Sequence, residues 1–146
     1  MNSIMKTMIL ISLTLIGRST YAQDTENKKL VFDITDLKII QKADSILSNS
    51  SKWNRHDDRE CDDDLASGKY SFYCALYKAS IDITGEYVHR RPAMEIVRFT
   101  LEKYENGRVK EHRLMDWNNH PDTKFKEVKR VLKESIQTVK RKLKQQ

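Results

Sequence analysis

The chain has 146 residues, a formal net charge of +6, 38% hydrophobic residues and two cysteines. This length suits one domain that buries a core without depending on metal ions or many disulfides. The sequence contains no internal repeat, no low-complexity linker and no sign of a second domain. We therefore predict a single helical domain over residues 33–146.

The N-terminus has the three-part layout of a secretory signal peptide. Lys6 precedes an apolar run over residues 8–16, and Thr20 and Ala22 are the small residues expected before a cut after Ala22. The run is shorter than the roughly 20 residues of a membrane-spanning helix. We predict a signal peptide over residues 1–22, export to the periplasm or the medium, and a flexible tail over residues 23–32. An uncleaved anchor is the alternative.

The positive charge is concentrated at one end of the chain. Loss of Lys6 and Arg18 with the signal peptide leaves a net charge of +4, and residues 122–146 alone hold nine Lys/Arg against three Asp/Glu. An exported protein rarely meets nucleic acid, so the favoured partners are an envelope protein or an anionic envelope component such as lipid headgroups. A solvated helix face without a partner is the simpler alternative.

Apolar residues at three- and four-residue spacing predict four helices. The most apolar stretch of the mature chain, residues 70–84, has apolar side chains on most sides, which is typical of a buried central helix. The other three start near Asp33, at Pro92, and at Asp122 or Thr123. The predicted fold class is all-α, a small bundle of about four helices around a buried central helix, with one disulfide.

The disulfide is predicted because two cysteines in an exported chain tend to pair, and Cys61 and Cys74 lie thirteen residues apart. An alternative is a cysteine-dependent hydrolase. Cys74 would then be a nucleophile in the first turn of a helix, where the thiol pKa falls. His120, His89 or His112 would supply the base, and Asn118 or Asn119 would orient it. A bridge to Cys61 excludes this chemistry.

Six carboxylates lie within residues 57–64, a composition that suggests calcium. The EF-hand pattern fails, because Asp63 stands at the turn position that needs Gly and Lys69 at the closing Glu position. We favour a solvated loop that pairs with the basic last helix, and keep an irregular calcium loop as the alternative. The remaining candidate metal ligands, which show no paired spacing, are His89, His112, His120 and Asp116. We predict no metal and no cofactor.

Two polar segments, residues 89–91 and 112–119, make the candidate binding surface. Arginine grips carboxylates and phosphates with two hydrogen bonds, and aromatic residues beside arginine often anchor interfaces. The candidates are His89, Arg90, Arg91, His112, Arg113, Asp116, Trp117, Asn118 and Asn119. In the structural alternative, Trp117 fills the core, Asn118 binds backbone near a turn, and the arginines pair with the acidic loop.

Trp53, the run YCALYKA at residues 73–79, DWNN at residues 116–119, Thr123 and the helix around residues 128–132 follow one another in a familiar order. In this order the chain resembles an uncharacterised bacterial family of small helical domains with a W…C-A-L…W-N-D/N…T…E-V pattern. It departs from that family at residues 76–78, where relatives have Gly-Ala, and at Asn119, where they have Asp. The resemblance implies a helical fold and no known activity, so we predict a non-catalytic binding or interaction module.

Overall fold

The structure is a computed structural model that describes residues 30–146. Within that range the chain forms a short 3₁₀-helix (Ser50–Lys52) and six α-helices and no strand: α1 (Ile34–Ile46), α2 (Asp62–Ser67), α3 (Phe72–Thr84), α4 (Pro92–Glu102), α5 (Arg113–Asn119) and α6 (Phe125–Leu143). The predicted signal peptide and nearly all of the predicted tail lie outside the described residues. None of the described helices has the length and apolar character to cross a membrane.

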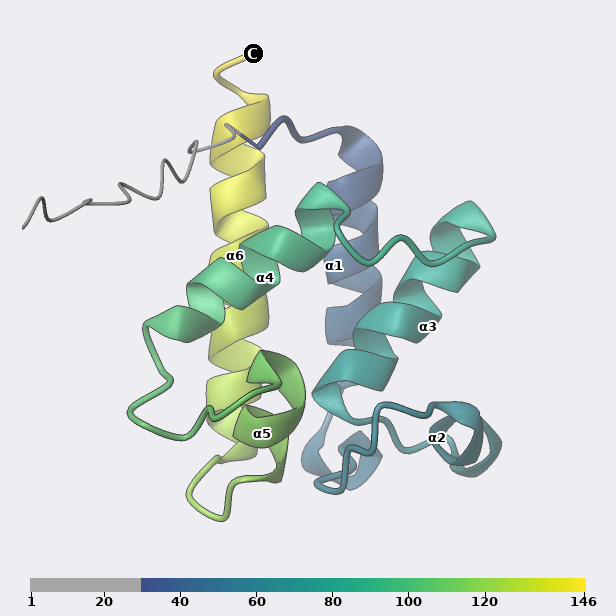
Figure 1. Ribbon diagram of the computed structural model, residues 1–146. Coiled ribbons are helices and arrows are strands. Elements are labelled where there is room, and N and C mark those ends of the chain that lie inside the picture. The colour runs from purple at the N-terminus through teal and green to yellow at the C-terminus, as the bar shows by residue number, and fades with distance from the viewer. Residues whose placement is uncertain (1–29) are drawn as a thin grey trace, which may run out of the picture.

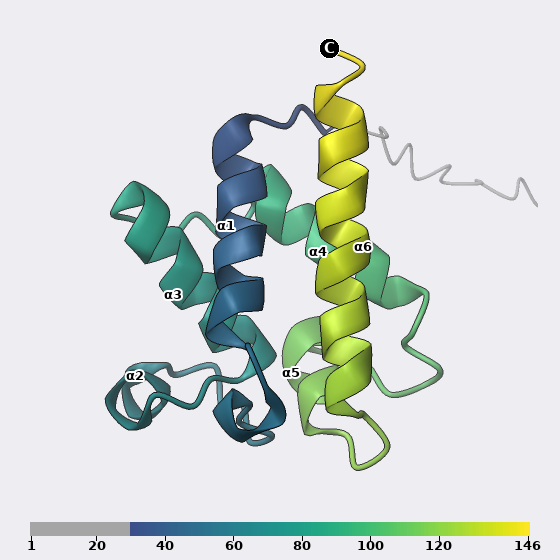
Figure 2. The ribbon, with the colours of Figure 1, turned by 180° about the vertical axis from the view of Figure 1, so that it is seen from behind.

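The helices form a two-layered bundle in which α1 makes the most extensive contacts with other helices. α1 and α6 lie side by side and run in opposite directions, and α4 crosses this pair on one face (Figures 1 and 2). α3 packs against α1, on the side away from α6, and against α5 (Figure 1). The predicted all-α bundle is confirmed. The predicted central helix, α3, lies beside α1 because Tyr73 and Tyr77 keep one of its sides partly exposed.

The ends of the helices follow the polar signals of the sequence. Asp33 and Asp36 form a reciprocal capping box at the start of α1, in which each carboxylate accepts the backbone N–H of the other residue at 2.9 Å. Ser71 caps α3 by accepting the N–H of Cys74 at 3.1 Å. Gly85 ends α3 in the left-handed conformation, with φ +80°.

One contiguous core holds the helices together. Its largest fully buried side chain is Trp117, which packs against the ring of Phe72 with the centroids 6.0 Å apart. Large aliphatic residues of α1, α3, α4 and α6 surround this pair: Ile39, Ile40, Leu76, Met94, Val97, Leu101, Val128, Val131 and Leu132. Phe32 is buried in the same core, so packing begins just before the predicted domain start at residue 33.

Two short helices form where the sequence predicted loops. α2 begins within the acidic segment, with Asp62, Asp63 and Asp64 in its first turn, where the helix dipole favours negative charge. α5 covers residues 113–119, which lack a clear apolar period because the helix has only two turns. The last helix begins later than predicted, at Phe125, because the Thr123 hydroxyl donates to the Trp117 carbonyl instead of capping α6.

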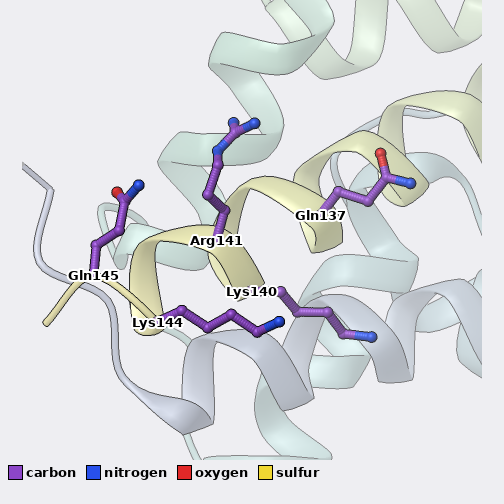
Figure 3. Close-up of a pocket in the computed structure, with 5 residues that line it drawn as sticks. All are labelled: Gln137, Lys140, Arg141, Lys144 and Gln145. Atoms are coloured by element: carbon purple, nitrogen blue, oxygen red, sulfur yellow. The ribbon is translucent and has the colours of Figure 1, made fainter.

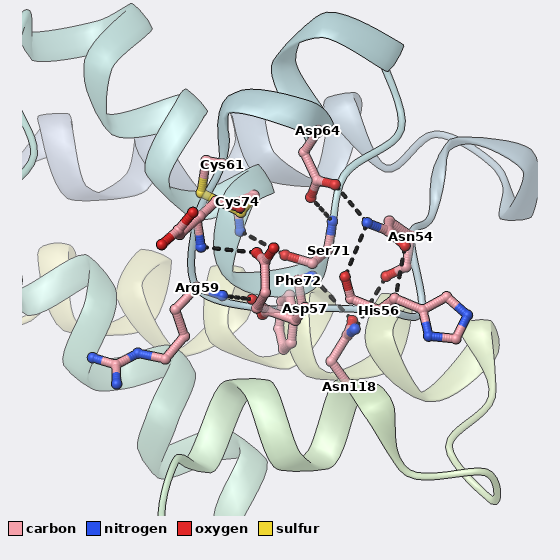
Figure 4. Close-up of a disulfide and its surroundings, with 12 residues drawn as sticks. Asn54, His56, Asp57, Arg59, Cys61, Asp64, Ser71, Phe72, Cys74 and Asn118 are labelled. Atoms are coloured by element: carbon pink, nitrogen blue, oxygen red, sulfur yellow. Dashed lines mark hydrogen bonds between the residues drawn. A yellow bond between two sulfur atoms is a disulfide. The ribbon is translucent and has the colours of Figure 1, made fainter.

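The predicted disulfide between Cys61 and Cys74 is present, with the two Cα atoms 5.4 Å apart. It joins the residue before α2 to the first turn of α3, and Cys74 is 1% exposed (Figure 4). The bond therefore fixes the acidic segment against the start of α3.

Candidate functional site

The predicted binding residues fall into two groups, one buried and one exposed. Asn118 is the centre of the buried group and is 0% exposed. Its Oδ1 accepts the indole N–H of Trp53 at 2.7 Å and the backbone N–H of Phe72 at 3.1 Å. Its amide nitrogen donates to the carbonyl of Asn54 at 3.0 Å. Asn118 thus joins α5 to the segments before α2 and α3, and its polar atoms are fully occupied by the protein itself.

The residues next to Asn118 in the sequence also bind other parts of the protein. Trp117 is buried and donates to the Tyr104 carbonyl at 3.0 Å. Asp116 accepts three successive backbone N–H groups at the start of α5, and these donors hold the pKa of its carboxyl below the ordinary value against the opposing effect of burial. Asn119 makes a two-bond clamp on the backbone of Asp57, with both bonds at 2.7 Å. The hydrogen-bonding groups of residues 116–119 are therefore used within the protein, and these residues are not part of the candidate binding surface.

Two of the predicted arginines are held by carboxylates of the helices. Arg91 pairs with Asp36 at 2.9 Å, which ties the start of α4 to the start of α1. Arg113 lies between Glu102 and Glu105, at 2.7 and 2.6 Å. The expected pairing of the arginines and of α6 with the acidic segment is wrong, because none of the ion pairs within residues 30–146 involves residues 57–64.

The acidic segment uses its two buried carboxylates to organise backbone (Figure 4). Asp64 accepts the backbone N–H of Ser71 at 2.6 Å and the amide of Asn54 at 2.5 Å. Asp57 accepts the N–H of Arg59 at 2.8 Å through Oδ1, while its buried Oδ2 has no hydrogen-bond partner. Burial raises the pKa of Asp57, and the nearby Asp64 and Asp58 add to the rise. Within residues 30–146, no three His, Cys, Asp or Glu side chains converge to hold a metal ion.

The exposed group of predicted residues meets in an open hollow of about 250 Å³ between α3, α4 and the start of α5. His89, His112 and Arg113 line it, together with residues that the sequence analysis did not single out: Arg59, Tyr73, Arg98, Glu111, Leu114 and Met115. Arginine and histidine side chains from four separate segments therefore face one small volume.

Arg59 is the distinctive residue of this hollow. Of the three arginines that line it, Arg59 is the one without a carboxylate partner among the described residues, since Arg98 pairs with Glu95 at 2.6 Å and Arg113 with its two glutamates. Its backbone has a φ of +68°, a conformation that costs a non-glycine residue about 1 kcal/mol or more. The chain keeps this strain at the position that presents a free guanidinium to the hollow.

Arginines lie close to both histidines of the hollow. The guanidinium of Arg59 lies 3.1 Å from Nε2 of His112 and can only donate, so the imidazole accepts there. Burial lowers the pKa of His89, and the positive charges of Arg98, Arg90 and Arg59 lower it further. An anion in the hollow opposes this effect at His89, because it favours the protonated imidazole.

Three tyrosines extend the hollow along α3. Tyr73, Tyr77 and Tyr87 form a partly exposed cluster with ring centroids 5.1 to 6.4 Å apart. A second hollow of about 240 Å³ shares Arg59 and Tyr73 with the first and is also lined by Tyr77. We call the combined feature the arginine–tyrosine surface, and it consists of Arg59, Tyr73, Tyr77, Tyr87, His89, Arg98 and His112.

The residues proposed for the hydrolase alternative do not form a catalytic group. The Cys74 sulfur is bonded to Cys61, so no thiol exists to act as a nucleophile. Asn118 is committed to the buried network, and His120 lies beside Asp122, with its Nδ1 accepting the N–H of that residue at 3.2 Å. Only His89 and His112 share a hollow.

Arg59 is hard to recognise in the sequence as a binding residue because six carboxylates surround it within residues 57–64. Tyr73 and Tyr77 lie within the apolar stretch predicted to be a buried helix, and their spacing of four places both on one side of it. A tyrosine pair at that spacing on a helix that is otherwise apolar was the available signal, because tyrosine keeps its hydroxyl near water when its ring is buried.

The fold and this surface define a small, disulfide-linked, all-α protein with a hollow lined by arginine, histidine and tyrosine. The chain belongs to DUF6197, a family of unknown function, whose model matches residues 32–138. The resemblance to a family of uncharacterised domains is confirmed to that extent. No curated protein and no solved structure matches the chain.

Proposed function

We propose that the protein is an exported, non-catalytic binding module that holds a carboxylate or phosphate group of an envelope partner on its arginine–tyrosine surface. The observation that carries the proposal is Arg59, an exposed residue on a strained backbone, whose guanidinium has no carboxylate partner among residues 30–146 and lies 3.1 Å from Nε2 of His112. A guanidinium fork binds carboxylate or phosphate with two parallel hydrogen bonds. Such a group would favour protonation of His89, because it offsets the positive charges that lower the pKa of that imidazole.

The three tyrosines favour a protein as the partner over a small free anion. Tyrosine and arginine are enriched among the residues that contribute most to protein–protein affinity. Tyr73 and Tyr77 stand on α3 next to the disulfide, so their backbone is already ordered before binding. Little conformational entropy is then lost when a partner covers them. An acidic segment of another exported protein fits this combination of charge and aromatic area.

Export is supported by two independent features. The layout of residues 1–22 is that of a signal peptide, and the Cys61–Cys74 bond is of the kind that persists in oxidising compartments. The signal peptide and its cleavage near Ala22 are tested by N-terminal sequencing of the protein recovered from the culture medium or periplasm.

The binding proposal is tested by NMR titration of the protein with a short acidic peptide and, separately, with inorganic phosphate. We expect the largest shifts at Arg59, Tyr73, His89 and His112. The Arg59→Gly variant removes the guanidinium and suits the positive φ, so it should keep the fold and lose most of the binding. The Arg90→Gln variant is the matched control, because Arg90 is exposed but does not line either hollow. Equal binding by both variants contradicts the proposal.

A further inference from the structure

The C-terminal end of α6 is the most positively charged part of the described chain. Its last turn and the residue after it carry four cations, and no carboxylate side chain follows Glu134. All four cations are exposed and none makes an ion pair within residues 30–146: Lys140, Arg141, Lys142 and Lys144. The earlier part of α6 differs, since Lys129 pairs with Asp44 of α1 and Glu127 pairs with Arg108.

These cations border a shallow, open hollow of about 440 Å³. Lys140, Arg141 and Lys144 line it together with two glutamines, Gln137 and Gln145 (Figure 3). Lys140 and Lys144 extend along one side of α6, and Arg141 projects to the other side (Figure 3). The aliphatic stems of these side chains make much of the exposed surface here, so the end of the helix is both basic and partly apolar.

Two exposed apolar side chains lie at the same end of the molecule. α1 begins beside the place where α6 ends, because the two helices are antiparallel neighbours (Figures 1 and 2). Ile34 is the first residue of α1 and is 56% exposed, and Val31, just before it, is 71% exposed. These are the two most exposed large hydrophobic residues of the described chain.

We propose that this end of the bundle, formed by the last turn of α6 and the start of α1, docks on an anionic lipid bilayer. Clustered lysine and arginine next to exposed apolar residues is the composition of surfaces that bind anionic headgroups and insert a few side chains at the interface. A bilayer fits better than a soluble acidic partner because the cations point to several sides of the helix end. A flat layer of anionic headgroups facing that end can contact all of them. None of the residues that line the arginine–tyrosine surface belongs to α6.

The test is co-sedimentation of the protein with vesicles of phosphatidylcholine alone and of phosphatidylcholine mixed with phosphatidylglycerol. We expect binding to the mixed vesicles only, weakened at high salt. Replacing Lys140, Arg141, Lys142 and Lys144 by glutamine should lower the partition coefficient by about tenfold or more, since each cation near an anionic surface adds to the attraction. Circular dichroism checks that the variant remains helical.

The matched control removes the same number of charges elsewhere. Lys52, Lys69, Lys110 and Lys126 are exposed, make no ion pair among the described residues and lie away from the end of α6. Their replacement by glutamine should change the partition coefficient by about threefold or less, the effect of net charge alone. The Arg59→Gly variant should bind vesicles like the wild type, which separates this proposal from the binding proposal above. Equal losses in the two four-site variants, or equal binding to both kinds of vesicle, overturn the docking proposal.

Discussion

Residues 112–119 supply polar side chains to two regions of the molecule. In one region these side chains are buried and hydrogen-bonded to the protein, and in the other they are exposed. In the network around Asn118, every donor and acceptor of the amide finds a protein partner, and the side chain is completely buried. In the arginine–tyrosine surface, His112 faces the exposed guanidinium of Arg59, which has no carboxylate partner among the described residues. Polar groups that the protein has satisfied hold the fold, and polar groups that it has left open are available to a partner.

The comparison also separates two kinds of arginine. Arg108 is 7% exposed, pairs with Glu127 at 3.0 Å and lies over the Trp117 ring. Its guanidinium is therefore not available to a binding partner. Arg59 has neither a carboxylate nor a relaxed backbone. Because strained backbone persists only where its surroundings hold it, the loop before Cys61 is held by the disulfide and by the Asn119 clamp on Asp57.

Substitution of Asn118 is the most direct test of the buried network. The Asn118→Ala variant leaves the indole N–H of Trp53 and the backbone N–H of Phe72 without acceptors. We expect a loss of about 4 kcal/mol in the free energy of unfolding, because each buried donor without a partner costs about 1 to 3 kcal/mol. Urea denaturation followed by tryptophan fluorescence measures it.

The matched control for this variant is Asn119→Ala. Asn119 is an exposed residue at the end of α5, and its side chain binds only the backbone of Asp57 and the side-chain amide of Asn118. We expect a loss of about 1 kcal/mol from the same measurement. If the two variants lose equal stability, the buried network does not hold the fold in the way we describe.

The disulfide is expected to have the next largest effect. Its loop of thirteen residues restricts the unfolded chain, which corresponds to about 3 kcal/mol in the chain-entropy view. The Cys61→Ala, Cys74→Ala double variant should lose about this much stability, and reducing agent should lower the stability of the wild type but not that of the variant. A wild type whose denaturation midpoint is insensitive to reducing agent contradicts the prediction.

Asp57 and Asp64 are both buried but differ in their hydrogen bonds. Asp57 leaves Oδ2 without a partner, whereas Asp64 accepts a hydrogen bond at each oxygen. The pKa of Asp57 is raised in the folded protein, so the carboxylate is penalised at neutral pH, and this penalty disappears as the pH falls through the folded pKa towards 3.8. The Asp57→Asn variant removes the buried charge and keeps an oxygen that can accept the N–H of Arg59. We expect it to be about 1 kcal/mol more stable than the wild type at neutral pH.

The control for this prediction is the pH dependence. The advantage of Asp57→Asn over the wild type should shrink on acidification, because protonated Asp57 carries no charge either. Asp64→Asn should instead destabilise the protein at neutral pH, since the Asp64 carboxylate accepts two hydrogen bonds. A neutral or destabilising effect of Asp57→Asn at neutral pH shows that Oδ2 is better satisfied than its geometry indicates.

The sequence predicted the parts of the fold that local physics decides. Caps at Asp33 and Ser71, Pro92 in a first turn and the long apolar stripe of α6 are signals contained within one or two turns of helix. The disulfide followed from the small number of cysteines and the expected compartment. The central role of α1 was not predictable in this way, because it depends on how four helices pack, and α3 carries the more apolar sequence.

The candidate site was predicted only in part, for a related reason. His89, His112 and Arg113 do share a hollow, but the sequence gives no means of telling an inward Asn118 from an outward one. Whether an arginine is free depends on carboxylates distant in the chain, such as Asp36 for Arg91. Arg59 was hidden for the same reason: none of its six acidic neighbours in sequence pairs with it, although Glu60 and Asp62 line the second hollow beside it.

The smallest expected effects concern the charge balance around His89. Arg98, Arg90 and Arg59 lower the pKa of this imidazole in addition to burial, Glu95 raises it, and Tyr87 lies in contact with it. Removing a neighbouring cation makes protonation easier, so Arg98→Gln should raise the pKa of His89 and Arg90→Gln should raise it by less. An NMR titration of the His89 ring signals measures both shifts.

Phosphate makes this measurement a test of the surface as a whole. An anion bound by Arg59 favours the protonated imidazole, so phosphate should raise the pKa of His89 in the wild type, and by linkage phosphate affinity should increase as the pH falls through that pKa. The Arg59→Gly variant should show the small rise caused by the lost cation and no further rise with phosphate. If phosphate raises the pKa of His89 equally in both proteins, Arg59 does not hold the anion. The histidines alone would then bind phosphate in the arginine–tyrosine surface.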